Sequence, residues 1–184
     1  MADFTQTVQG TTSKNQSDGS SNGWQFFMDV SYTQNVDEAS TTFTVHQYLK
    51  AKYRTYGGGY DYKNTIGSSN TGTIHKTTDV VGSTGNNWVT VDLVPTYTQT
   101  IYHQDDGNIS SSGNTITLKA YFLAEDTQYS PGTCNASVTL TIPKIETEWG
   151  TATIYIDNGT SWDEYEAYID NGSSWDKYTV YLGK

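Results

Sequence analysis

Apolar and polar residues alternate with a period of two along several stretches of this chain. At positions 134, 136, 138, 140 and 142 the residues are Cys, Ala, Val, Leu and Ile, and those between are Asn, Ser, Thr and Thr. Residues 116–122 repeat the alternation, and residues 96–103 form a third such stretch that ends near Gly107, a residue suited to the positive φ of a tight turn. Each stretch predicts a half-buried antiparallel strand.

The N-terminal half shows the same pattern. Strands are predicted at residues 3–8, 24–33, 41–53 and 88–94. The predicted core faces of the two longest are Trp24, Phe26, Met28, Val30 and Tyr32, and Phe43, Val45, Leu49 and Ala51. Seven or eight strands in about 140 residues, with frequent turn signals, predict an all-β antiparallel β-sandwich. The pattern leaves both an immunoglobulin-like and a jelly-roll order open.

Three short motifs punctuate the strands of residues 96–143. They are His103-Gln-Asp-Asp-Gly107, Tyr129-Ser-Pro-Gly132 and Leu140-Thr-Ile-Pro143. This succession resembles a module found in minor structural and tail-fibre-like proteins of siphophages, over residues 24–145. The resemblance implies a virion component with a β-sandwich domain, and it brings no catalytic residues with it.

The C-terminal segment contains a tandem repeat of 13 residues. Residues 155–167 read YIDNGTSWDEYEA and residues 168–180 read YIDNGSSWDKYTV. Asp-Asn-Gly in each copy is a strong hairpin-turn signal. The repeat predicts a three-stranded β-meander with strands at 151–156, 161–169 and 174–182. We therefore expect two units, a sandwich at residues 1–145 and an aromatic, acidic meander at 146–184.

The predicted meander is too small to be stable by itself. It carries eight acidic residues against Lys177 and Lys184, together with three tryptophans and five tyrosines. Its stability must come from the sandwich, another copy of the chain, a neighbouring protein or a ligand. Such repeats also resemble, loosely, the aromatic-glycine repeats of bacterial wall-binding modules, in which aromatic rings stack on sugars.

Aromatic side chains are the candidate contact residues. In the repeats these are Trp162, Tyr165, Trp175 and Tyr178, and the alternative is that their rings simply pack the meander. Tyr56 and Tyr60 flank Gly57–Gly59, where the sequence predicts either a flexible hairpin loop or a tyrosine-rich contact loop.

Composition narrows the classes of partner. The net charge is −10, so phosphate repulsion argues against a nucleic-acid partner. No stretch is apolar over the length of a membrane helix, and the N-terminus lacks the basic and apolar regions of a signal peptide. The single cysteine, Cys134, excludes an intramolecular disulfide and is expected to be a buried apolar residue.

No residue pattern points to catalysis. His46, His75 and His103 lack metal-pair spacing, and His103 is expected to cap a turn. The run Asp105-Asp106-Gly107-Asn108 lacks the distal acid of a calcium loop. We therefore expect no enzyme activity, no cofactor and no metal.

The function expected from the sequence is that of a non-enzymatic structural protein of a tailed-phage virion, associated with the tail tip or a fibre and acting in host-surface attachment. A capsid decoration protein and a carbohydrate-binding adhesion module are the alternatives. The expected partners are other virion proteins, further copies of the chain in a homo-oligomer, and host-surface glycans. The expected location is the virion, after assembly in the cytoplasm of the bacterial host.

Overall fold

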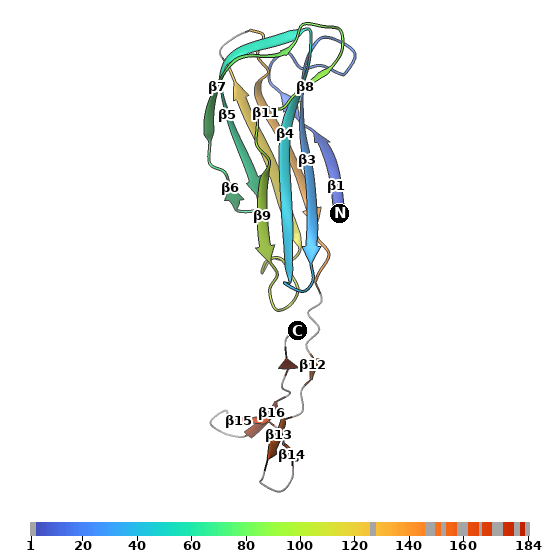
Figure 1. Ribbon diagram of the computed structural model, residues 1–184, viewed down its shortest axis with the longest axis vertical. Helices are drawn as coiled ribbons and strands as arrows, with labels where there is room; N and C mark the ends of the chain where they lie inside the picture. The colour runs from blue at the N-terminus through green and yellow to red at the C-terminus, as the bar shows by residue number, and fades with distance from the viewer. Residues whose placement is uncertain are drawn as a thin grey trace.

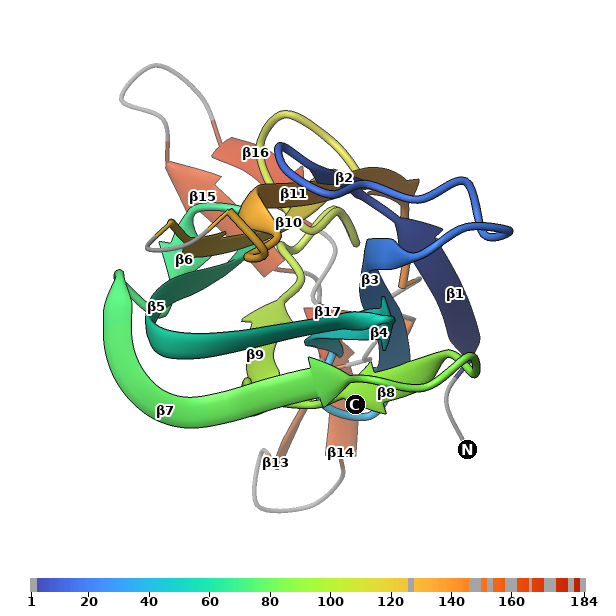
Figure 2. The same cartoon turned by 90° about the horizontal axis from the view of Figure 1, so that it is seen from above.

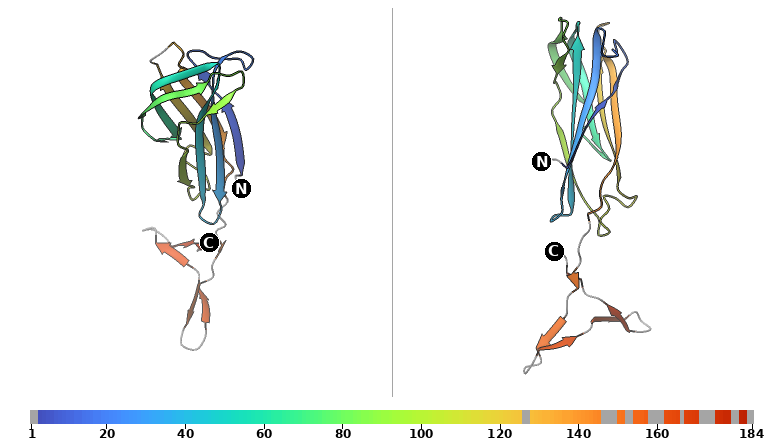
Figure 3. Two further views of the ribbon diagram at one scale, coloured as in Figure 1. Left: turned by 45° about the horizontal axis from the view of Figure 1, so that its top comes forward. Right: turned by 90° about the vertical axis from the view of Figure 1, so that its right-hand side faces the viewer.

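The computed structural model describes residues 3–125 and 128–145, and the backbone of six short strands between Gly150 and Leu182. The regular elements in this part of the chain are all β-strands. The strands between residues 4 and 141 form two antiparallel sheets packed face to face (Figure 1). The predicted β-sandwich is confirmed. Seen from the side, the two layers stand next to one another along the long axis (Figure 3).

The first sheet holds five strands. They are β1 (Phe4–Gln9), β3 (Gly23–Asn35), β4 (Ser40–Lys52), β8 (Val89–Val91) and β9 (Tyr97–Tyr102). The order is β1-β3-β4, after which β8 pairs with one end of β4 and β9 with the other. β3 and β4 form a hairpin that pairs in unbroken register from Gly23–Lys52 to Asn35–Ser40.

The second sheet holds six strands. They are β2 (Thr11–Thr12), β5 (Arg54–Ile66), β6 (Ser69–Asn70), β7 (Ile74–Ser83), β10 (Thr115–Ala124) and β11 (Gly132–Thr141). The order is β2-β11-β10-β5, and β5 then pairs with both β6 and β7. Figure 2 shows the two sheets seen along the long axis, one against the other.

The residues that the alternation predicted for the core are buried. Trp24, Phe26, Met28 and Val30 are at most 1% exposed, and Phe43, Val45, Leu49 and Ala51 lie beside them on the same face, from β4. From the second sheet come Ile116, Leu118, Ala120, Phe122 and Cys134. Because each side chain points opposite to its neighbours along a strand, one sheet face is apolar and the other polar.

The N-terminal strand is shared between the sheets. β1 pairs with β3, and two residues later β2 pairs with β11. At the crossing point, Gly10 donates its N–H to Phe26 O, and a Cβ at Gly10 would collide with the backbone of Asn135. If β1 and β2 are counted as one strand, the second and third strands, β3 and β4, lie in the same sheet. The order therefore differs from the immunoglobulin constant-type order, in which those two lie in opposite sheets.

The glycine run at residues 57–59 is not a hairpin loop. It lies inside β5, where a β-bulge between Tyr56 and Gly58 shifts the register against β7. β5 and β7 curve together (Figure 2). A Cβ at Gly57 would collide with Asp79 O, so the close approach of the two strands requires glycine there.

The turn after β9 confirms the role expected for His103. Its Nδ1–H donates to Gly107 O at 2.7 Å, and its Nε2 lies 2.7 Å from the Thr41 hydroxyl. Gly107 has the expected positive φ, 79°. Gly107 O also accepts the N–H of Ile145, so this one turn holds the last residue of the described sandwich.

The C-terminal repeats form separate hairpins where one meander was expected. β13 (Ile154–Asp157) pairs with β14 (Trp162–Tyr165), and β15 (Ala167–Asp170) pairs with β16 (Trp175–Tyr178). A third ladder joins β12 (Gly150–Thr151) to β17 (Tyr181–Leu182). β13 and β14 lie on either side of the first predicted Asp-Asn-Gly turn, and β15 and β16 on either side of the second. However, the stretch predicted as one strand at 161–169 is divided into β14 and β15, so each turn organises its own ladder.

Candidate functional site

Exposed large apolar side chains of the described sandwich are concentrated near one end of it. Six large apolar side chains are well exposed in the described residues, and four of them are near this end: Tyr53 (47% exposed), Val80 (72%), Val89 (45%) and Tyr129 (49%). We call these four residues the apolar tip. Loops at the end of a sandwich are a common place for binding residues, because a rigid scaffold holds them.

Strand pairing brings the apolar tip together. Val89 lies opposite Ala51 at the end of β4, and the Tyr53 N–H donates to Gly85 O. Arg54 follows at once and places its guanidinium 5.6 Å from the centre of the Tyr129 ring. These contacts join the end of β4 and the start of β5 to β8, at the top of the sandwich in Figure 1, and to the loop between β10 and β11.

Tyr53 has an unusual backbone conformation. Its φ is +52°, a region that bulky residues rarely occupy because the side chain crowds the backbone. This geometry turns the chain sharply from β4 into β5 and leaves the tyrosine side chain at the surface. Residues held in such conformations are concentrated at functional sites.

Two further contacts stiffen the loops around the apolar tip. Trp24 is fully buried and donates its Nε1–H to Tyr129 O at 2.7 Å. Trp88 donates its Nε1–H to Gly19 O at 3.0 Å, which joins the loop before β8 to the loop before β3. The surface is therefore formed by loops anchored on the core.

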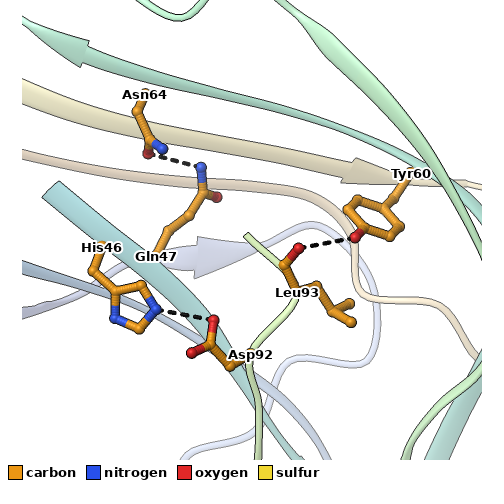
Figure 4. Close-up of polar contacts among 6 residues, drawn as sticks. All are labelled: His46, Gln47, Tyr60, Asn64, Asp92 and Leu93. Carbon is orange, nitrogen blue, oxygen red and sulfur yellow. Dashed lines mark hydrogen bonds and ion pairs between the residues drawn. The ribbon is translucent and has the colours of Figure 1, made fainter. Parts of the chain in front are cut away.

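Tyr56 and Tyr60 do not form the exposed contact loop that was one prediction for them. They are 2% and 4% exposed. Tyr56 donates its hydroxyl to Gly59 O, and Tyr60 donates to Leu93 O at 3.0 Å (Figure 4). The rings fill the core beneath the bend of β5, so the glycines that suggested a loop in fact allow the bend that buries these tyrosines.

The four predicted contact residues of the repeats occupy matching positions in the backbone. Trp162 begins β14 opposite Asp157, and Trp175 begins β16 opposite Asp170. Tyr165 and Tyr178 end the same two strands. Their side chains lie outside what the structure describes, so their role in contacts stays a prediction.

A shallow hollow of about 190 Å³ lies on the outer face of the second sheet. It is lined by Gly59, Tyr60, Asp61, His75, Leu123 and Glu125. His75 Nδ1 lies 2.8 Å from Asp61 Oδ1. Nearby, the pKa of Tyr121 is raised, first by partial burial and then by the negative charges of Asp61 and Glu125. The His75 ring lies over Gly59, where a Cβ would come within 2.8 Å of it, so the pair also has a packing role.

A row of stacked side chains covers part of the outer face of the first sheet. Phe27 and Tyr48 stack with centroids 5.3 Å apart, and His46 stacks on Tyr48 at 5.6 Å. Lys50 covers Phe27, and Asp92 binds His46 at 2.9 Å (Figure 4). Phe27 and Tyr48 thus each have two neighbours on their rings, which explains why these two side chains are half-buried.

Within residues 3–125 and 128–145, no three His, Cys, Asp or Glu side chains are grouped as a metal site would need. The described chain also has no helix with the length and apolarity to cross a membrane. The single cysteine, Cys134, is fully buried, as expected. In comparisons with protein-family models, curated proteins and solved structures, none matched this chain.

Proposed function

We propose that this protein is a non-enzymatic structural protein of a tailed-phage virion, held near the tail tip or a fibre, and that it takes part in attachment to the host surface. The observation that carries the proposal is the apolar tip, because it lies at the end opposite to the point where the chain leaves the sandwich at Ile145. The motifs at His103–Gly107, Tyr129–Gly132 and Leu140–Pro143 support the virion assignment by their resemblance to siphophage proteins.

The chain segments that enter and leave the sandwich support a role for one end in attachment to the virion and for the other in binding. Gln34 donates two hydrogen bonds: its N–H donates to the Asp3 carboxylate at 2.6 Å, and its side-chain amide donates to Pro143 O at 2.9 Å. The N-terminal and C-terminal segments of the described sandwich are therefore both joined to Gln34, at the end of the sandwich opposite the apolar tip. A sandwich attached through this end would present the apolar tip outward.

The two repeat hairpins support a role in assembly. They place the same residue types at the same register positions, Trp162 with Trp175 and Tyr165 with Tyr178. Two equal units on one short segment allow bivalent contact, which strengthens binding beyond the affinity of either unit. The acidic composition of this segment favours a basic surface on a neighbouring virion protein.

Mass spectrometry of purified phage particles tests the virion assignment. We expect the chain at a reproducible number of copies per particle. Its presence only in the infected-cell lysate would refute the proposal. A few copies per particle would indicate the tail, whereas tens to hundreds would favour the alternative of a capsid decoration protein.

Variants at the apolar tip test the attachment role. Val80→Asp places a charge on the most exposed member of the tip, and we expect particles that contain it to adsorb more slowly to host cells. Val36→Asp is the matched control, because Val36 is 66% exposed in the β3–β4 turn at the other end. Copy number is measured in parallel, and equal adsorption of the two variants at equal copy number would remove the tip from the attachment site.

A further inference from the structure

The strand β9 has an open edge. It pairs with β4 on one side, and no strand of the described chain pairs with it on the other. The hydrogen bond from His103 N–H to Ala39 O sets the alternation of this ladder. Tyr97, Gln99 and Ile101 therefore bond to β4, while the backbone groups of Thr98, Thr100 and Tyr102 point away from it.

This edge lacks the usual protection against pairing with another chain. Natural sheets protect an edge with charged side chains, proline within the strand or a bulge. Residues 93–104 contain no Asp, Glu, Lys or Arg, and β9 pairs with β4 without a register shift. By contrast, β7 at the edge of the second sheet carries Lys76 and Asp79 and faces the bulge in β5.

The side chains of β9 divide between the core and the surface. Tyr97 and Ile101 pack against the core, whereas Tyr102 is 68% exposed on the outer face. The Thr100 hydroxyl is 2.9 Å from the Thr42 hydroxyl of β4, so this part of the outer face is polar but uncharged. An exposed aromatic residue beside open backbone groups is suited to a strand partner.

We propose that β9 pairs with β9 of a second copy of this chain, antiparallel about a two-fold axis at Thr100. In that register Thr100 lies opposite its counterpart and Thr98 lies opposite Tyr102. These are the residues whose backbone groups face the open edge, so the ladder closes without a shift. Tyr102 of each copy then covers Thr98 of the other, an aromatic and β-branched pair of the kind that stabilises antiparallel sheets. The Thr100 carbonyl already accepts from Gln99 Nε2 at 3.0 Å and has a second lone pair for the partner.

The absence of charge along β9 allows a second copy of this chain to be the partner. The chain carries a net charge of −10, so most of its faces repel their own kind. In a two-fold interface every charge near the axis meets its own copy, and an uncharged edge avoids this repulsion. The other open edge of the first sheet, β1, is less suitable, because Asp29 of β3 faces it directly and binds Thr7 at 2.6 Å. The dimer does not depend on the virion assignment.

Sedimentation analysis of the full chain tests the dimer. We expect the wild-type protein to sediment as a reversible dimer of its 20.4 kDa chain. Thr100→Lys places two like charges opposite one another at the axis, and we expect the dimer dissociation constant to rise at least about tenfold. The matched control is Asn135→Lys, which adds the same charge at an exposed site on β11, a strand paired on both sides at that residue.

Cross-linking locates the interface independently. Because Cys134 is buried, Thr100→Cys introduces the one accessible thiol of the described chain. A short bifunctional maleimide should then yield a covalent dimer, and Asn135→Cys should yield far less. Circular dichroism and thermal unfolding confirm that each variant is folded.

Three outcomes would overturn the proposal. The wild-type protein is a monomer throughout the accessible concentrations, the Thr100→Lys protein dimerises as tightly as the Asn135→Lys protein, or the chains form open-ended polymers. The last result would point to pairing of β9 with β1 of the next copy, because a head-to-tail contact does not close at two chains.

Discussion

Gln47 and Asn64 form a hydrogen bond between the two sheets through the middle of the core. Gln47 of β4 donates its Nε2–H to Asn64 Oδ1 of β5 at 2.9 Å, and both side chains are fully buried (Figure 4). Around them lie apolar side chains, so the pair is a polar contact in a region where burial of an unpaired amide is costly. It fixes one relative position of the sheets.

The first prediction concerns this pair. Asn64→Leu leaves the Gln47 amide without its partner side chain, and we expect a loss of about 1–3 kcal/mol in the free energy of unfolding. The double variant, Gln47→Leu with Asn64→Leu, removes both amides and should lose less than the sum of the single variants. A double-mutant cycle from urea unfolding measures the coupling free energy between the two residues. Additive losses would show that Gln47 and Asn64 are not coupled.

The second prediction concerns the bend in β5. Gly57→Ala puts a Cβ against Asp79 O, and we expect a loss of about 1–3 kcal/mol of stability from overpacking. Gly85→Ala is the control, because its Cβ would meet no atom closer than 3.9 Å. Thermal unfolding of the two variants compares them. Equal melting temperatures would mean that β5 and β7 can separate without cost.

The third prediction concerns Cys134. Burial raises the pKa of its thiol well above the ordinary value, so the folded state retains a proton that the unfolded state releases above its pKa of about 8.5. The contribution of this group to stability is therefore complete below that pH and is lost as the pH rises further. Urea unfolding at pH 7 and pH 10 should show a smaller decline for Cys134→Ala than for the wild type.

The same burial predicts the reactivity of Cys134. The thiolate is the reactive form, so an aromatic disulfide reagent at pH 8 should label the folded protein far more slowly than the urea-unfolded protein. Asn135→Cys in the folded protein provides the positive control, because Asn135 is exposed. Rapid labelling of the folded wild type would show that the end of β11 opens readily.

The fourth prediction concerns the C-terminal repeats. The described core residues all lie between Trp24 and Ile145, so deletion of residues 146–184 should leave a folded sandwich with a cooperative unfolding transition. We expect the shortened protein to fail to incorporate into particles. An unfolded product would show that the repeats belong to the core, and normal incorporation would assign them to outward binding.

The strands were predictable because their core side chains alternate regularly with polar ones along each strand. Alternation placed Trp24, Phe43 and Phe122 on buried faces, and each is buried. The same alternation puts Gln47 on the buried face of β4, but a pattern of apolar residues says nothing about a polar one among them. Its partner Asn64 lies outside the stretches predicted as strands, so the pair could not be predicted.

The candidate surfaces were harder to predict. Three glycines in a row are a strong loop signal, and only strand pairing with β7 reveals that they form a bulge. The apolar tip combines residues from four distant segments, and no local pattern links Tyr53 with Tyr129. The open edge of β9 is a property of strand order, although its lack of charge is visible in the sequence.

The hydrogen bonds of Gln34 to Asp3 and to Pro143 have a mechanical consequence. The polypeptide enters and leaves the sandwich at neighbouring points, so tension along the chain passes across this junction and hardly along the length of the strands. Such a pull would open β1 from its Phe4 end, one ladder bond at a time, which needs less force than sliding two strands past each other. A domain connected in this way yields early at its base, while the far end keeps its shape.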